Sequence, residues 1–171
     1  PNDVLDVESF VDDFRKKIEI SKNQPVPNLI NLLENLGIFI IEMKLPNQYD
    51  KFDGLYEIVE DIPFIIIRGD FCDGARKRFT LAHELGHLLL EFKTNMEQKE
   101  IEKYCNKFAS SFLLPRDAMI REFSERRRNI SFYEIDSIKR EYKVSHSAIV
   151  YRLNDLKIIN PDYINAQKMN R

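Results

Sequence analysis

The spacing of apolar positions predicts two helices near the start of the chain. Apolar residues recur at helical spacing in Ser9 to Ile20 and again in Asn28 to Leu36. The second helix is expected to end at Gly37, because glycine readily adopts the left-handed conformation that closes a helix. Each segment is expected to contribute one face to a hydrophobic core.

Three short runs rich in β-branched and aromatic residues follow these helices. They are Ile38 to Met43, Gly54 to Glu60 and Phe64 to Arg68. Asparagine, aspartate and proline residues, which are typical of turns, separate the three runs. The pattern predicts a small three-stranded sheet.

A longer helix is predicted over Arg76 to Glu91. Apolar side chains cover more than half of its circumference, so most of it is expected to be buried. The remaining polar arc contains Thr80, His83, Glu84, His87 and Glu91. Because buried polar groups need partners, a metal or an open cleft is expected beside this arc.

The next helix is predicted over Glu97 to Leu114 and is expected to end at Pro115. Its apolar face is made of Ile101, Cys105, Phe108, Ala109 and Phe112. Helices that follow a small sheet in this way indicate an α+β fold in which the sheet packs on a helical core.

The arrangement His83-Glu84-x-x-His87 within the first of these helices points to metal chemistry. Residues four apart lie on the same helical face, so both imidazoles can reach one ion at about 2.1 Å, and Glu84 flanks that ion. This pattern is typical of zinc metalloproteases. The alternative is an amphipathic helix with solvated histidines, which fits poorly with a helix that is buried around most of its circumference.

A catalytic zinc site usually has three protein ligands and one open position. Glu102 lies at the margin of the apolar face of the next helix, on the side shared with Asn106, whereas Glu100 points away. The segment between His87 and Glu102 is long enough for the second helix to return beside the first. Glu102 is therefore the preferred third ligand, with a solvated carboxylate as the alternative.

The C-terminal third differs from the rest of the chain in charge. Residues 116–171 carry 12 Lys and Arg against 8 Asp and Glu, or +4, whereas residues 1–115 carry 14 against 20, or −6. We therefore expect a metallopeptidase core over 1–115 and a helical segment over 116–171 packed on it.

Two helices are expected in this C-terminal segment. Ser131 and Glu134 form a capping box for a helix ending near Tyr142, and a second helix ends near Leu156. This helix-turn-helix outline suggests DNA contact, or docking of a DNA-bound protein. The alternative is a helical pair that completes the core, and the modest positive charge favours it. His146 is expected at the start of the second helix, without a catalytic role.

Composition indicates one globular, cytoplasmic protein. The 171 residues are 43% hydrophobic and 32% charged, which is normal for a chain that buries a full core. No signal peptide is recognisable, and the longest apolar runs are too short to span a bilayer. The two isolated cysteines, Cys72 and Cys105, suggest reduced thiols and not a disulfide framework.

Two stretches of the chain together resemble a known family. RFTLAHELGHLLL followed by IEKYCNKFASSFLLP is similar to the ImmA/IrrE metallopeptidases. PVPNLINLLENLGIFII, FDGLYEI and PFIIIRGD resemble the elements before that family's zinc helix, and IKREYKVSHSAIVYRLNDLKII resembles its helix-turn-helix-like segment. The resemblance covers about Pro25 to Ile159.

The resemblance implies a zincin-like core with Zn²⁺ on His83, His87 and Glu102 and with Glu84 as the catalytic base. Many members have a second glutamate two residues after the first, where this chain has Tyr104, and this strengthens the assignment of Glu102. In zinc peptidases that the chain resembles, an edge strand beside the zinc helix pairs with extended substrate. Gly54 to Glu60 or Phe64 to Arg68 is expected to be that strand.

The resemblance also implies a function. The expected substrate is a helix-turn-helix transcriptional repressor whose cleavage releases stress-response, mobile-element or phage genes. The alternative is a regulatory protein-binding or DNA-binding module, such as a toxin-antitoxin or phage-defence component, in which the peptidase site is latent. Glu84 argues for the enzyme, because a pure binding module needs no base beside the metal.

Overall fold

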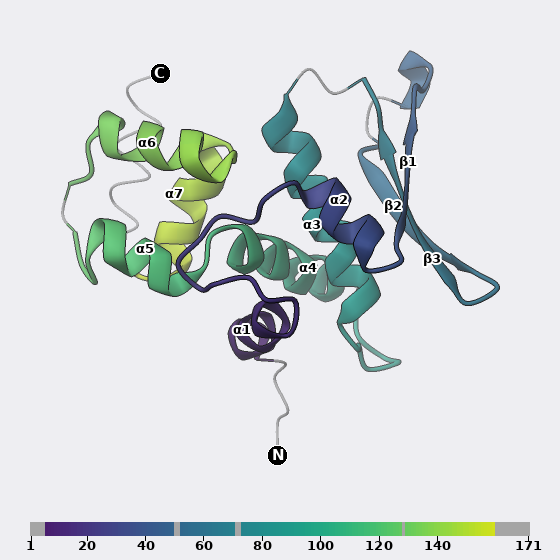
Figure 1. Ribbon diagram of the computed structural model, residues 1–171, viewed down its shortest axis with the longest axis horizontal. Coiled ribbons are helices and arrows are strands. Elements are labelled where there is room, and N and C mark those ends of the chain that lie inside the picture. The colour runs from purple at the N-terminus through teal and green to yellow at the C-terminus, as the bar shows by residue number, and fades with distance from the viewer. Residues whose placement is uncertain (1–5, 50–51, 71–72, 128, 160–171) are drawn as a thin grey trace.

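Seven helices and a three-stranded sheet make up the described part of the chain, which is an α+β fold (Figure 1). The computed structural model describes residues 6–49, 52–70, 73–127 and 129–159, so Cys72 lies outside the described residues. The elements in order are α1 (Val7–Lys17), α2 (Leu29–Asn35), β1 (Phe39–Met43), the short 3₁₀ helix η1 (Asn47–Tyr49), β2 (Gly54–Val59), β3 (Ile62–Arg68), α3 (Gly74–Leu89), α4 (Gln98–Leu113), α5 (Arg116–Phe123), α6 (Phe132–Tyr142) and α7 (His146–Asp155).

The sheet has the order β1-β3-β2, with β1 parallel and β2 antiparallel to the central strand β3. A two-residue turn joins β2 to β3, and Glu60 and Asp61 both have positive φ there, at 51° and 65°. Such turns match the twist of a hairpin. The predicted start of β3 at Phe64 was too late, because the strand begins at Ile62 and passes through Pro63. The proline is tolerated because pairing with β1 begins only at Phe64.

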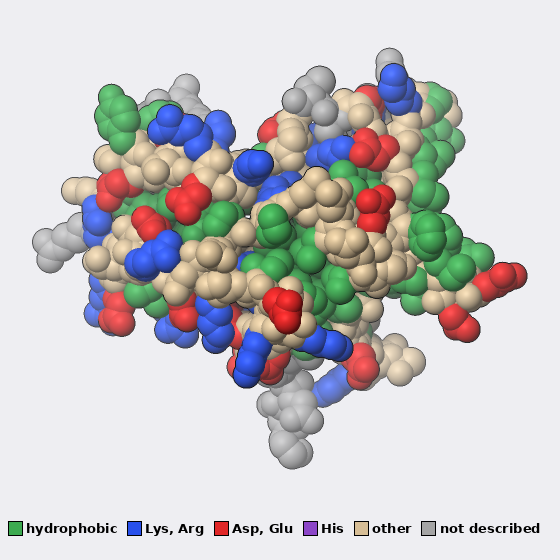
Figure 2. Space-filling model, viewed as in Figure 1, with side chains coloured by type: hydrophobic (Ala, Val, Ile, Leu, Met, Phe, Trp, Pro, Cys, Tyr) green, Lys and Arg blue, Asp and Glu red, His purple; other side chains and the backbone are tan. Residues whose placement is uncertain are grey.

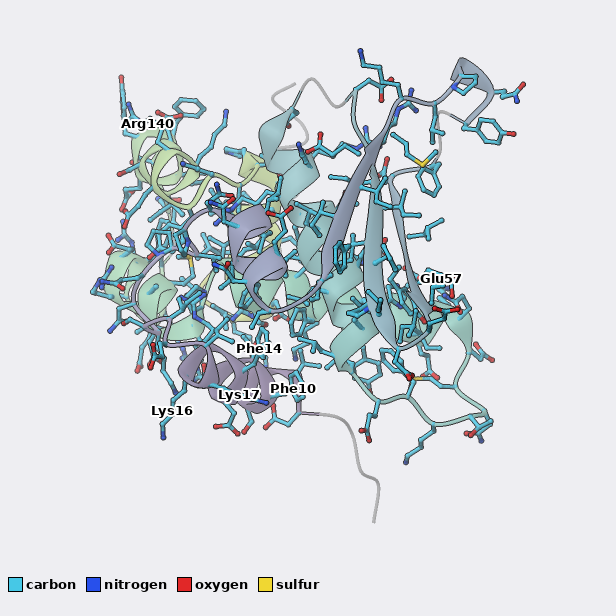
Figure 3. The ribbon with its side chains drawn as sticks, turned by 45° about the vertical axis from the view of Figure 1, so that its right-hand side comes forward. Phe10, Phe14, Lys16, Lys17, Glu57 and Arg140 are labelled. Atoms are coloured by element: carbon cyan, nitrogen blue, oxygen red, sulfur yellow. The ribbon has the colours of Figure 1, made fainter. Side chains whose placement is uncertain are left out.

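Helix α3 packs against one face of the sheet, and α4 lies along α3. Ile65 and Ile67 of β3 are fully buried beneath α3. On the other side of α4, the Phe10 and Phe14 rings of α1 contact Phe108, with ring centroids 6.2 and 6.3 Å away (Figure 3). The core therefore lies between the sheet and α1, with the α3–α4 pair in its centre.

The other face of the sheet exposes apolar side chains. Figure 2 shows them as a green strip on the right-hand side of the molecule, over the sheet. The exposed members on this face are Phe39, Ile41, Met43, Leu55, Val59 and Ile62. Within the described residues, the sheet thus buries only one of its two faces.

The C-terminal helices include one that was not predicted, since α5 begins directly after Pro115. The predicted capping box is present, because the Ser131 and Glu134 side chains each bond the other's backbone N–H. Four aliphatic side chains of α6 and α7 are buried, as expected for a pair that packs on the rest of the molecule; they are Ile135, Ile138, Ile149 and Leu153. The boundary between residues 115 and 116 stays a prediction.

A buried arginine connects α7 to the N-terminal part of the chain. Arg152 is fully buried, its Nε donates to the Leu114 carbonyl at 2.9 Å, and its two terminal nitrogens bond Glu8 of α1 at 2.5 and 2.9 Å. Asp155 accepts a further bond at 3.1 Å. This network was not foreseen, since arginines usually lie at the surface.

Replacing Glu8 with glutamine is expected to lower the free energy of unfolding by about 2 kcal/mol, because Arg152 would stay buried with one counter-ion fewer. Burial raises the pKa of Glu8, but the hydrogen bond and charge of Arg152 lower it more, so it lies below its usual value. The stabilisation by Glu8 should therefore be present above the usual glutamate pKa and be lost as the pH falls through the folded-state pKa. Urea unfolding of the wild type and Glu8→Gln at several pH values measures this. A difference in their free energies of unfolding that did not shrink in acid would contradict it.

No helix among the described residues has the length and apolar character needed to cross a membrane.

Candidate metal centre

The two histidines of α3 lie one turn apart on the same face of the helix. Asp73 caps the start of α3 by accepting a hydrogen bond from the Ala75 backbone, and the helix continues unbroken to Leu89. The Nε2 atoms of His83 and His87 are 3.2 Å apart, and their side chains are only 15% and 9% exposed. The helix therefore holds the two imidazole rings next to each other in a largely buried position.

Glu102 of α4 brings a carboxylate to the same point. Its Oε2 lies 3.1 Å from Nε2 of His83, and its Oε1 lies 3.5 Å from Nε2 of His87. Ligand atoms bound tetrahedrally at about 2.0–2.1 Å from one ion lie about 3.3 Å from one another. The two imidazole nitrogens, 3.2 Å apart, and Oε2 of Glu102, 3.1 Å from Nε2 of His83, lie close to that spacing, while His87 approaches the other carboxylate oxygen at 3.5 Å. One ligand atom from each of the three residues lies within 4.8 Å of the others, and the two-nitrogen, one-oxygen donor set suits zinc.

Gly86 allows α4 to approach α3 closely enough for this geometry. A Cβ at this position would lie 3.2 Å from Cδ1 of Phe108 and 3.3 Å from Cα of Cys105. The Glu102 carboxylate is also held by Gln98, whose amide nitrogen donates to Oε1 at 2.6 Å. Close packing of the two helices thus brings the Glu102 carboxylate beside the two histidines.

Replacing Gly86 with alanine is expected to weaken metal binding several-fold and to destabilise the fold by about 1 kcal/mol, because overpacking outweighs the better helix propensity of alanine. Gly74 gives a matched control on the same helix, since a Cβ there meets nothing within 4 Å. Gly74→Ala should leave both properties unchanged or slightly raise stability. Zinc titration and thermal unfolding of the two variants test this. Equal zinc affinities and equal unfolding temperatures in Gly86→Ala and Gly74→Ala would contradict it.

Two further side chains orient the histidines. Nδ1 of His83 lies 3.0 Å from Oδ1 of Asn106, so a proton on Nδ1 donates to this oxygen and leaves the lone pair of Nε2 available to a metal. The Tyr56 ring of β2 stacks on His87, with centroids 5.2 Å apart and planes 11° apart. Sequence analysis assigned neither role, although Asn106 lies one turn after Glu102 and on the same side of α4.

Glu84 lies beside the metal ligands in a buried position, with 7% of the residue exposed. Burial and the nearby Glu102 carboxylate raise the pKa of Glu84 to about 7. The pKa of His87 is lowered, first by burial and then by His83, which favours the neutral imidazole that binds metals. The arrangement provides a carboxyl group that can take up and release a proton near neutral pH.

Other residues with metal-binding or nucleophilic side chains do not join this centre. His83, His87 and Glu102 form the one group of at least three histidine, cysteine or acidic side chains that could hold a metal in the described part of the chain. Glu91 follows the end of α3 and is exposed, contrary to its predicted place on the polar arc of that helix. His146 begins α7 and stacks on Phe132. Burial raises the pKa of Cys105 to about 12, so its thiol stays protonated.

One of the two strands predicted to receive a substrate is excluded by the sheet. β3, which contains Phe64 to Arg68, is paired on both sides, whereas β2 pairs only with β3 among the residues that the structure describes. β2 also adjoins the metal centre, because a Cβ on Gly54 would lie 3.3 Å from Cγ of Glu84. β2 is therefore the edge strand beside the site.

An α+β fold in which a His-Glu-x-x-His helix meets a carboxylate from the following helix is the arrangement of a metallopeptidase. The chain belongs to the peptidase M78 family, described as the IrrE N-terminal-like domain, whose family model matches residues 33–154. The resemblance to the ImmA/IrrE metallopeptidases is thereby confirmed.

A search among solved structures supports the fold. A transcriptional regulator of Mycobacterium tuberculosis is similar, with a TM-score of 0.62 and 16% sequence identity over 88% of this chain and 47% of that one. The chain thus spans about half the length of this regulator. No curated protein matches the chain in sequence.

Proposed function

We propose that the protein is a zinc-dependent endopeptidase with His83, His87 and Glu102 as the metal ligands and Glu84 as the catalytic base. The observation that carries this proposal is the convergence of His83, His87 and Glu102, whose ligand atoms all lie within 4.8 Å of one another, beside a buried carboxyl group. Zinc, when bound, would supply a Lewis acid for the substrate carbonyl and for the attacking water.

The protein groups would then handle the protons. Glu84 takes a proton from the attacking water and later gives it to the amine that leaves when the peptide bond breaks. Without a metal, burial and the Glu102 carboxylate raise the pKa of Glu84 to about 7. The positive charge of bound zinc would lower this pKa and favour the ionised form that accepts the proton. Asn106 keeps the His83 ring in one orientation throughout.

We infer that β2 holds the substrate. An extended peptide that pairs with the free edge of β2 would have its backbone donors and acceptors satisfied while its scissile carbonyl faces the centre. Tyr56, on this strand, contacts His87 directly, so the strand and the metal ligands are held in a fixed relation. This geometry suits an endopeptidase that cleaves unfolded or looped segments.

The proposed substrate is a helix-turn-helix transcriptional repressor in the cytoplasm, and its cleavage would release stress-response, mobile-element or phage genes. Membership of the peptidase M78 family supports a protein substrate. A structural neighbour that is a transcriptional regulator supports a role in gene control.

A second candidate function is a regulatory binding module with a latent peptidase site. The helical pair α6–α7 favours it, because this pair has the helix-turn-helix outline used in DNA contact. Its main apolar side chains are buried, however, which a structural role also explains.

Incubation of the zinc-loaded protein with the repressor encoded beside it tests the proposal. We expect cleavage at one or a few bonds, mapped by mass spectrometry, and no cleavage after removal of the metal by a chelator. Binding of the intact repressor without cleavage would instead identify a binding module.

A further inference from the structure

A cavity of about 490 Å³ lies away from the metal centre, between α2, the first turns of α3 and the end of α6. Figure 2 shows blue side chains around the notch between α6 and the α2–α3 side of the molecule. The apolar part of the lining includes Leu29, Ile30, Leu81 and Val144. A cavity of this size is typical of small-molecule sites.

The charged residues that line this cavity are all cationic. They are Lys77, Arg78, Lys139 and Lys143. Lys77 is paired with Oε1 of Glu42 at 2.5 Å, and Glu42 is not part of the lining. In the part of the chain that the structure describes, Lys139 and Lys143 have no carboxylate partner. The cavity therefore presents a net positive charge.

Arg78 is the most informative of these residues, because it is 91% buried, with 9% exposed. Its guanidinium donates to the carbonyl oxygens of Pro27, at 3.0 Å, and Val26. Its Nε is buried without an acceptor among the described residues, and no carboxylate pairs with the guanidinium there, so Arg78 would act on a ligand in the cavity through its charge. A buried cation without a counter-ion is costly, so a bound anion would stabilise it.

We propose that this cavity binds a small phosphorylated molecule that joins a phosphate group to a planar or apolar portion, as a nucleoside monophosphate does. The phosphate would lie among the lysines and Arg78, and the apolar portion would lie against Leu29, Ile30 and Leu81. A nucleic acid backbone fits less well, because the cavity is concave and no residue of α7 lines it.

The position of the cavity gives the ligand a structural role. α3 and α2 form one side and α6 the other, so a ligand would bridge the α3 helix and the C-terminal helices. The same α3 helix carries His83 and His87 two to three turns further on. The proposal does not depend on the peptidase proposal, since none of the metal-centre residues lines the cavity.

Titration calorimetry of the full chain with adenosine 5′-monophosphate (AMP) tests the site, with adenosine and inorganic phosphate as partial probes. We expect AMP to bind at least about tenfold more tightly than either partial probe, because each lacks one part of the recognition. Lys139→Gln/Lys143→Asn should weaken AMP binding about tenfold by removing two charges from the phosphate site. Asparagine suits position 143, whose φ is 53°.

Lys16→Gln/Lys157→Asn is a matched control. Lys16 lies on the exposed side of α1 (Figure 3), and Lys157 follows α7 with a φ of 58°. The control should bind AMP as the wild type does, and both variants should unfold at the wild-type temperature without ligand. Absence of AMP binding at millimolar concentration, equal binding of AMP and adenosine, or equal loss in both double variants would overturn the proposal. Binding of a DNA duplex but not of AMP through the same two lysines would also overturn it.

Discussion

Replacing Glu84 with glutamine is expected to reduce peptide cleavage by about 10²–10⁴-fold, because the variant keeps the shape of the side chain but cannot accept the proton of the attacking water. Zinc content should not change, since Glu84 is not one of the three grouped donors. Stability should not fall either, because a neutral amide replaces a carboxyl group whose pKa is already raised to about 7 by burial. Initial rates of repressor cleavage measure the activity, metal analysis measures the zinc content, and thermal unfolding measures the stability.

Glu100→Gln is the matched control for this experiment. Glu100 is an exposed glutamate in the first turn of α4 and belongs to no metal-binding group among the described residues. The control should retain full activity. Substantial activity in Glu84→Gln, with none lost in the control, would assign the base to another residue and contradict the proposed mechanism.

Replacing Glu102 with alanine is expected to weaken zinc binding more than about 100-fold. Loss of a residue that only orients a ligand already weakens metal binding by about 10–100-fold, and this substitution removes a proposed ligand itself. Among the described residues, the metal-binding group contains only the two histidines besides Glu102, and Glu84 does not belong to it. Cleavage should fall with the metal. Competition with a chromophoric chelator measures the affinity, and metal analysis measures the occupancy.

Thermal unfolding in the presence of a chelator separates loss of the metal from loss of the fold. The Glu102 side chain is 42% exposed and packs little, so wild type and Glu102→Ala should unfold at nearly the same temperature when no metal is bound. An unchanged zinc affinity in a folded Glu102→Ala variant would show that the third ligand lies elsewhere.

The part of the site that sequence analysis found is the part that local spacing determines. His83, Glu84 and His87 lie within two turns of one helix, so helical geometry alone places them together. Glu102 was reached from the periodicity of the next helix, which also indicated that Asn106 lies on the same side. The class of the fold followed in the same way, from apolar spacing in separate segments.

The features that sequence analysis missed depend on tertiary contacts. Tyr56 reaches His87 only because β2 crosses beside α3, and no local pattern marks that approach. The buried arginines Arg78 and Arg152 bond the carbonyl groups of Pro27 and Leu114, which lie more than 35 residues away along the chain. The sequence left two candidates for the edge strand beside the site, Gly54 to Glu60 and Phe64 to Arg68. Only the strand order β1-β3-β2 shows which of the two lies at an edge.

The most direct test of the central claim is a crystal structure of the zinc-loaded protein with anomalous diffraction recorded at the zinc absorption edge. We predict one strong anomalous peak about 2.0–2.2 Å from Nε2 of His83, Nε2 of His87 and a carboxylate oxygen of Glu102. A zinc ion bound elsewhere, or no peak between these three side chains in crystals grown with zinc, would contradict the account.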